Sequence, residues 1–113
     1  MGIYLTATGL YKPAYQISND ELVAAFNTYV DNYNAEHAKA IAAGDKVALQ
    51  HSSSEFIEKA SGIKSRYVID KKGILDPKIM APIFPARKLG EELSVMAEMG
   101  LAALKDALDR AKL

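Results

Sequence analysis

The chain contains no cysteine among its 113 residues. This absence excludes disulfides, thiolate metal ligands and a cysteine nucleophile from these residues, and it is compatible with a reducing compartment. The chain also has no excess charge of either sign, because 14 basic residues balance 14 acidic ones. We therefore expect no general attraction to nucleic acid or to an anionic membrane, and any basic site must be local.

Long apolar runs are also missing from the sequence. No run reaches the roughly 20 residues that a membrane-spanning helix needs. The first residues lack the basic-then-apolar layout of a signal peptide. Half of the residues are hydrophobic, which is enough for the core of one small domain. We predict a soluble, cytoplasmic protein.

Signatures of metal and phosphate chemistry are scarce. His37 and His51 are the only histidines, and they stand in no HExxH-type spacing. The glycines form neither a GxGxxG pattern nor a P-loop. We predict no metal site and no cofactor, and we interpret both histidines as solvated side chains.

The first half of the chain predicts one strand followed by helices. Residues 2–10 are rich in Ile, Tyr, Leu and Thr, which favours a strand. A capping box formed by Ser18 and Glu21 then opens a helix with one apolar stripe. An alanine-rich piece at 35–43 ends near Gly44. Residues of about 33–51 are therefore predicted to form a helical excursion at the surface.

The middle of the chain predicts a short helix and a second strand. Ser52 and Glu55 form another capping box, and Gly62 is placed to close the helix after about two turns. The alternating segment 63–69 then predicts a strand, which the turn residues 71–73 would end.

The last part of the chain predicts a loop and a long helix. Three prolines within 74–87 exclude regular structure there. The helix predicted at 89–111 is apolar on more than one side and should be buried on two sides. The acidic pairs Asp20-Glu21 and Glu91-Glu92 are interpreted as helix-start residues, because acidic groups stabilise the positive end of the helix dipole.

These elements do not complete a closed domain. A helix that ends the chain with no following strand leaves a βαβ unit unfinished. We therefore predict that residues 1–113 form the N-terminal portion of a larger α/β protein, rich in helix and with about two strands.

A cluster of basic residues lies at the end of the short helix and in the residues after it, and two interpretations of this cluster stay open. The cluster could bind a phosphate-bearing ligand or an acidic partner, or it could be a solvated basic face. It comprises Lys59, Lys64, Arg66, Lys71 and Lys72.

Three blocks of sequence, in order, carry a resemblance to a known family. They read TATGLYKPAYQISNDEL, SSSEFIEKASGIKSRYV and SVMAEMGLAALKDALDRAKL. Together they cover most of the chain, and the middle block is the most specific. The order resembles the beginning of the β-ketoacyl-acyl-carrier-protein synthase III family of the thiolase superfamily. The family's middle motif resembles SxEWIxxRTGIxxRR.

The resemblance implies a layered αβαβα fold in a cytoplasmic, usually homodimeric condensing enzyme of fatty acid biosynthesis. Such an enzyme moves an acyl group from acyl-CoA to a cysteine and condenses it with malonyl on acyl carrier protein. The catalytic cysteine, histidine and asparagine are expected beyond Leu113, so this chain alone is expected to hold no catalytic residue. The CoA thioester is a substrate, not a cofactor.

The resemblance also implies a CoA-binding edge. The family's adenine-stacking tryptophan falls on Phe56, and a threonine falls on Ser61. An arginine that meets the adenine end falls on Ala60, so its charge is lost here. Ser52, Lys64 and Arg66 complete the predicted CoA-binding residues.

The lost charge at Ala60 and the long segment between Leu22 and Ser52 depart from the plainest members. These departures favour a medium-chain acyl donor, or a differently held CoA, over acetyl-CoA. The alternative from another class is a noncatalytic interaction or oligomerisation module that docks through its apolar last helix.

Overall fold

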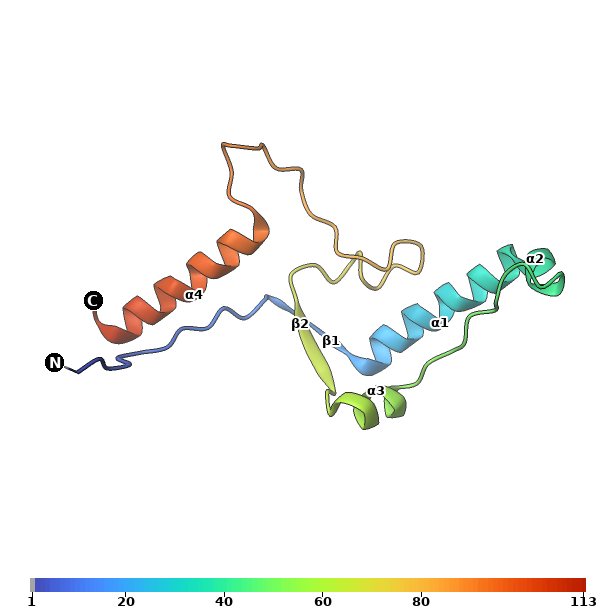
Figure 1. Ribbon diagram of the computed structural model, residues 1–113, viewed down its shortest axis with the longest axis horizontal. Coiled ribbons are helices and arrows are strands. Elements are labelled where there is room, and N and C mark those ends of the chain that lie inside the picture. The colour runs from blue at the N-terminus through green and yellow to red at the C-terminus, as the bar shows by residue number, and fades with distance from the viewer. Residues whose placement is uncertain (1) are drawn as a thin grey trace. The chain divides into compact units, whose positions relative to one another are not determined.

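A computed structural model describes residues 2–113, so Met1, where the predicted domain begins, lies outside the described residues. The chain divides into two compact units. The central unit is Pro13–Phe84, and the terminal unit combines 2–12 with Pro85–Leu113. The described residues form four helices and a two-stranded sheet, so the predicted mixed α/β class is confirmed (Figure 1).

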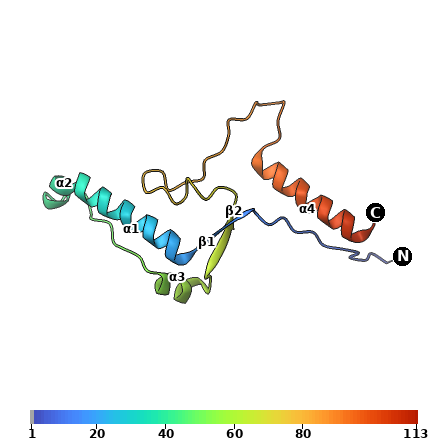
Figure 2. The ribbon, with the colours of Figure 1, turned by 180° about the vertical axis from the view of Figure 1, so that it is seen from behind.

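The sheet pairs β1 (Tyr15–Ser18) with β2 (Ser65–Val68) in antiparallel fashion, as the views of Figures 1 and 2 show. Ile17 lies opposite Arg66 and is fully buried. The second predicted strand is thus confirmed in a shorter form. The strand predicted at 2–10 is wrong, because these residues have no regular structure. Within residues 2–113 the sheet consists of β1 and β2 alone, and residues 2–10 pair with neither strand.

Helix α1 (Asn19–Glu36) begins at the predicted capping box. The Ser18 hydroxyl accepts a hydrogen bond from the Glu21 amide at 3.2 Å, and the Glu21 carboxylate accepts one from the Ser18 amide at 2.9 Å. The helix buries Ala25 and Val30, which with Ile17 form the small core of the central unit.

The alanine-rich piece forms a short helix, α2 (Ala38–Ala42), after a break at His37. Gly44 then adopts a φ of 81°, in the left-handed region that ends helices. Residues 47–53 return without regular structure toward α3. The bounds predicted for the helical excursion stay a prediction.

Helix α3 (Ser54–Ser61) is clipped as predicted, and Gly62 closes it with a φ of 72°. The predicted cap is wrong by one residue. Ser53, not Ser52, caps the helix by accepting a hydrogen bond from the Phe56 amide at 3.1 Å. The reason is that Asn27 holds both backbone groups of Ser52, which keeps the chain extended through Ser53.

The loop at 74–87 lacks regular structure, as its prolines predict. Helix α4 (Val95–Ala111) begins six residues later than predicted, where Ser94 caps it by accepting from the Ala97 amide. The pair Glu91-Glu92 therefore lies in a turn before the helix, where both amides donate to the Lys88 carbonyl. Its interpretation as a helix-start pair is wrong, whereas that of Asp20-Glu21 is confirmed.

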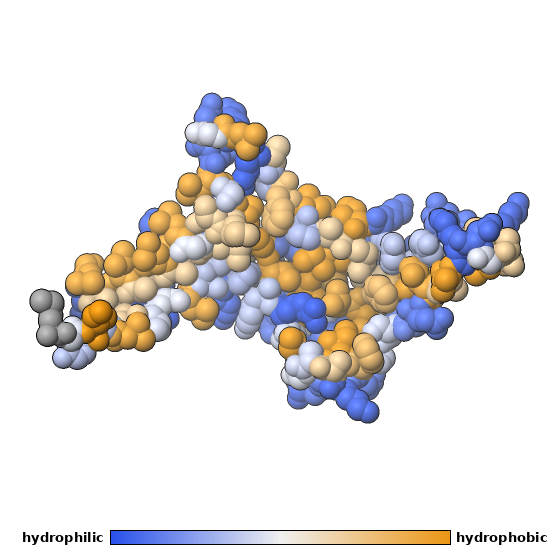
Figure 3. All heavy atoms as spheres, viewed as in Figure 1, coloured by the Kyte–Doolittle hydropathy of each residue, from blue (hydrophilic) through white to orange (hydrophobic). Residues whose placement is uncertain are grey.

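Apolar side chains gather over α4 in Figure 3. None of its residues is buried in the described part of the chain, although burial on two sides was predicted. The exposed large side chains on this helix are Met96, Leu101, Leu104 and Leu108.

Candidate functional site

Phe56 lies in the first turn of α3 with 66% of its surface exposed. It lines an open hollow of about 380 Å³ together with His51, Ser52 and Ser53. The hollow thus joins one aromatic face to hydroxyl and imidazole groups. Such a mixture suits a flat ring that carries hydrogen-bonding atoms at its edge.

The other predicted residues are not gathered in this hollow. Lys64 lines a separate hollow of about 210 Å³ beside the first turns of α1 and α3. Ser61 and Arg66 line neither of the two. Of the predicted CoA-binding residues, the structure brings together Phe56 and Ser52.

The Ser61 hydroxyl is engaged in the end of its own helix. It donates to the Ile57 carbonyl at 2.6 Å and accepts from the Ile63 amide at 3.2 Å. It therefore stabilises the turn through Gly62, which sets the direction in which the chain leaves α3.

Two lysines of the basic cluster form ion pairs with acidic residues of α1 and α3. Lys64 lies 3.5 Å from Glu58 and keeps 80% of its side chain exposed. Lys71 lies 2.8 Å from Glu21, and the Lys71 ammonium lowers the pKa of the Glu21 carboxyl, with help from the Ser18 amide. These pairs take up part of the local positive charge, so the cluster is less basic than its sequence indicates.

Arg66 reaches back to α1. Its Nη2 lies 3.5 Å from the Oδ1 of Asn19, a buried residue whose amide also donates to the Ile63 carbonyl at 2.6 Å. Its Nε is buried without a hydrogen-bond partner in the described residues. Arg66 and Asn19 thus connect β2 and the turn after α3 to the start of α1.

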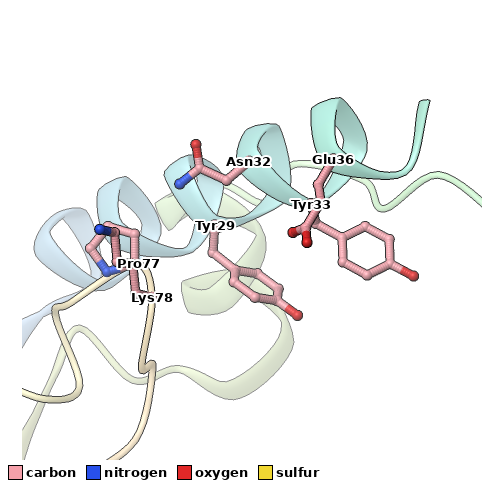
Figure 4. A pocket seen from close by; sticks show the side chains of 6 residues that line it. All are labelled: Tyr29, Asn32, Tyr33, Glu36, Pro77 and Lys78. Carbon is pink, nitrogen blue, oxygen red and sulfur yellow. The ribbon is translucent and has the colours of Figure 1, made fainter. Parts of the chain in front are cut away.

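A second aromatic hollow, of about 240 Å³, was missed by the sequence analysis (Figure 4). It lies between α1 and the loop after β2. Its two tyrosines, Tyr29 and Tyr33, belong to the apolar stripe predicted for this helix, so no sequence signal distinguishes them from packing residues. The lining residues are Tyr29, Asn32, Tyr33, Glu36, Pro77 and Lys78.

Both histidines contact neighbouring groups. His51 Nε2 lies 2.6 Å from Asp31 Oδ1, and the ring centroids of His37 and Tyr33 lie 4.3 Å apart with the rings tilted by 33°. Among residues 2–113, no group of three or more His, Cys, Asp or Glu side chains is arranged to hold a metal ion. Within the same residues, no helix combines the length and the apolar character needed to cross a bilayer.

The chain was compared with protein-family models and with known proteins. No protein-family model matches the chain. The chain is, however, 56% identical over 87 residues, 77% of its length, to a β-ketodecanoyl-[acyl-carrier-protein] synthase of Pseudomonas aeruginosa. The chain belongs to the β-ketoacyl-acyl-carrier-protein synthase III family. This confirms the resemblance, and the chain spans 25% of the length of that ketoacyl synthase.

Proposed function

We propose that the complete protein carrying these residues is a condensing acyltransferase of fatty acid biosynthesis with a layered thiolase-like fold. It transfers an acyl group from acyl-CoA to an enzyme cysteine and condenses it with malonyl on acyl carrier protein, with release of carbon dioxide. The observation that carries the proposal is the 56% identity to a ketoacyl synthase over most of the chain. Residues 2–113 contribute an edge of the CoA entrance and not the chemistry.

The hollow beside Phe56 is the proposed seat of the CoA adenine. An exposed phenyl ring gives the adenine a face to stack on, and Ser52 in the same wall offers a hydroxyl group. Lys64 is exposed enough to meet a CoA phosphate. Ser61 and Arg66 act indirectly in this proposal, through the turn at Gly62 and through Asn19.

The acyl donor is proposed to be of medium length. The relative is named for a ketodecanoyl product, which has ten carbons. Condensation with malonyl adds two carbons, so an eight-carbon donor would give that product. We extend this donor class to the present protein, and we place the protein in the cytoplasm as a homodimer that requires no further cofactor.

Calorimetric titration of the complete protein with CoA tests the proposed edge. Because stacking of a base on an aromatic ring contributes about 1–3 kcal/mol, Phe56→Ala should weaken CoA binding by about fivefold or more. Phe84→Ala is the control, since Phe84 is another exposed phenylalanine of the same unit and does not line the hollow. Unchanged affinity in Phe56→Ala would remove Phe56 from the site.

A second candidate function, a noncatalytic interaction module, is favoured by one observation. Helix α4 exposes large apolar side chains, including 82% of Met96 and 55% of Leu104. A helix of this kind can dock on a partner or on a second copy. The substitution Leu104→Glu in the complete protein separates this candidate from the synthase, because Leu104 lies on α4.

A further inference from the structure

Three polar residues of α1 form a stripe along one side of the helix. Asn27, Asp31 and Asn34 are spaced by four and three residues, the spacing that places helical side chains on one face. All three bind the returning segment 49–52. They are called the α1 clamp below.

The two asparagines of the clamp make the same pair of hydrogen bonds. Asn27 donates to the Ser52 carbonyl at 3.0 Å and accepts from the Ser52 amide at 2.9 Å. Asn34 donates to the Leu49 carbonyl at 3.0 Å and accepts from the Leu49 amide at 2.9 Å. Each side-chain amide thus satisfies both backbone groups of one residue, as a neighbouring strand would.

Between the asparagines, the Asp31 carboxylate lies 2.6 Å from His51 Nε2. The clamp therefore holds three of the four residues in the segment 49–52. Its members contact the segment in reverse order, because the segment runs antiparallel to α1.

The spacing of the clamp matches the dimensions of the backbone. Seven helical residues rise by about 10.5 Å from Asn27 to Asn34. Three extended residues span about 10 Å from Leu49 to Ser52. A shift of the segment would displace both backbone pairs and separate His51 from Asp31, so the three contacts together define the register.

This register fixes the hollow beside Phe56. Ser52 immediately precedes the Ser53 cap of α3, and His51 and Ser52 are themselves walls of the hollow. Two further contacts hold α3 against α1: the Ser54 hydroxyl donates to Asp20, and Asn19 binds the Ile63 carbonyl. Helix α1 thus holds the chain before, at and after the helix that carries Phe56.

We propose that Asn27 is a positioning residue for the CoA-binding edge, and that it acts by fixing the register of 49–52. This inference rests on the proposed function. Without Asn27, the Ser52 backbone loses its partners at the point where the hollow begins. The distance between Phe56 and the wall formed by His51 and Ser52 would then no longer be fixed.

The test is carried out in the complete protein with Asn27→Ala and the control Thr28→Ala. Thr28 is exposed on the same helix, and its hydroxyl donates to the Ala24 carbonyl within that helix. Asn27→Ala should raise the KM for acyl-CoA about three- to tenfold and leave kcat within about twofold, because the lost hydrogen bonds act on binding. Thr28→Ala should change neither constant.

A double-mutant cycle shows whether Asn27 acts through the hollow. The effects of Asn27→Ala and Phe56→Ala on CoA affinity should be less than additive, since both disturb one site. If Asn27→Ala does not fold, Asn27→Asp serves instead, because it keeps the size of the side chain and the acceptor for the Ser52 amide but loses the donor.

The outcomes separate this inference from the proposed function. A lower melting temperature with an unchanged KM for acyl-CoA would mean that Asn27 is merely structural and would overturn the inference. Loss of CoA affinity in Phe56→Ala alone, with additive effects in the cycle, would overturn the inference and keep the CoA edge. No effect of Phe56→Ala would instead overturn the proposed CoA edge.

Discussion

At the scale of single residues, Ala60 is where the proposed CoA edge lacks the positive charge that the family resemblance implies. Ala60 is exposed on α3, four residues after Phe56. A cation placed over an aromatic ring contributes about 0.5–1 kcal/mol at an exposed site. We therefore expect Ala60→Arg to tighten CoA binding in the complete protein about two- to fivefold by calorimetry.

The control for this prediction is Ala60→Leu, which adds bulk without charge and should not tighten binding. Equal affinities of the arginine and leucine variants would show that no part of CoA lies near position 60. The prediction thus tests the orientation of the ligand along α3, which Phe56→Ala alone leaves open.

Gly9 lies where the structure leaves no room for a side chain. A Cβ at this position would collide with the Ala103 carbonyl oxygen and with Ala107 of α4, within the terminal unit. Gly9→Ala should therefore lower the free energy of unfolding by about 1–3 kcal/mol, measured by urea denaturation. Gly100→Ala is the control, because open space surrounds Gly100 and alanine favours helix by about 0.5–1 kcal/mol. An equal loss in both variants would contradict the close approach of residues 9 and 103–107.

At the scale of elements, the start of α1 couples helix capping to pH. The Lys71 ammonium and the Ser18 amide lower the folded-state pKa of Glu21 below its ordinary 4.5. A lowered folded pKa gives stability that is present above the unfolded pKa and is lost as the pH falls through the folded pKa. Glu21→Gln keeps an acceptor for the Ser18 amide but removes this dependence. We expect melting temperature to fall less steeply below about pH 5 in Glu21→Gln than in the wild type.

Lys71→Met provides the control for this pH dependence. It should flatten the acid limb of the wild type but add little in the Glu21→Gln background, because both substitutions remove the same pair. A parallel acid limb in Glu21→Gln and the wild type would show that the pair does not contribute to the pH dependence of stability.

Elements whose signals are local were predictable from sequence. The Ser18 cap, the Gly62 stop and the proline loop each depend on residues within about one helical turn of each other. The prediction of Ser52 as the cap was wrong because Asn27, which binds the Ser52 backbone, is distant in sequence. The strand at 2–10 failed for a similar reason, since strand propensity becomes a strand only beside a partner, and β2 pairs with Tyr15–Ser18.

The candidate site shows the same division between local and distant signals. Phe56 was predicted from the family motif, and Ser52 was predicted beside it; both line the hollow. His51 was interpreted as solvated, and its place in the wall follows from the α1 clamp. No local sequence pattern indicates the clamp. The side-chain partners of Asn27 and Asn34 lie in the segment 49–52, which is distant from them in sequence.

At the scale of the whole molecule, the two candidate functions differ in what should cover α4. In a synthase, the remainder of the complete protein should pack on its apolar residues. In an interaction module, a second copy or a partner should do so. Either way, the isolated 113-residue chain should associate, and light scattering should give a mass that rises with concentration. A monomer at high concentration would contradict this expectation for both candidates, and it would exclude the interaction module, whose function is association.

The substitution Leu104→Glu in the complete protein distinguishes the synthase from the interaction module. If α4 is covered by the same polypeptide, a buried carboxylate without a partner should lower the melting temperature and the yield of folded protein. If α4 is an interface of a module, the same substitution should dissociate the assembly while the melting temperature of the protomer stays unchanged. Val47→Glu is the matched control, because Val47 is 85% exposed and lies outside α4. We expect the first result, since the 56% identity to a ketoacyl synthase continues over 77% of the chain and favours a synthase over a module.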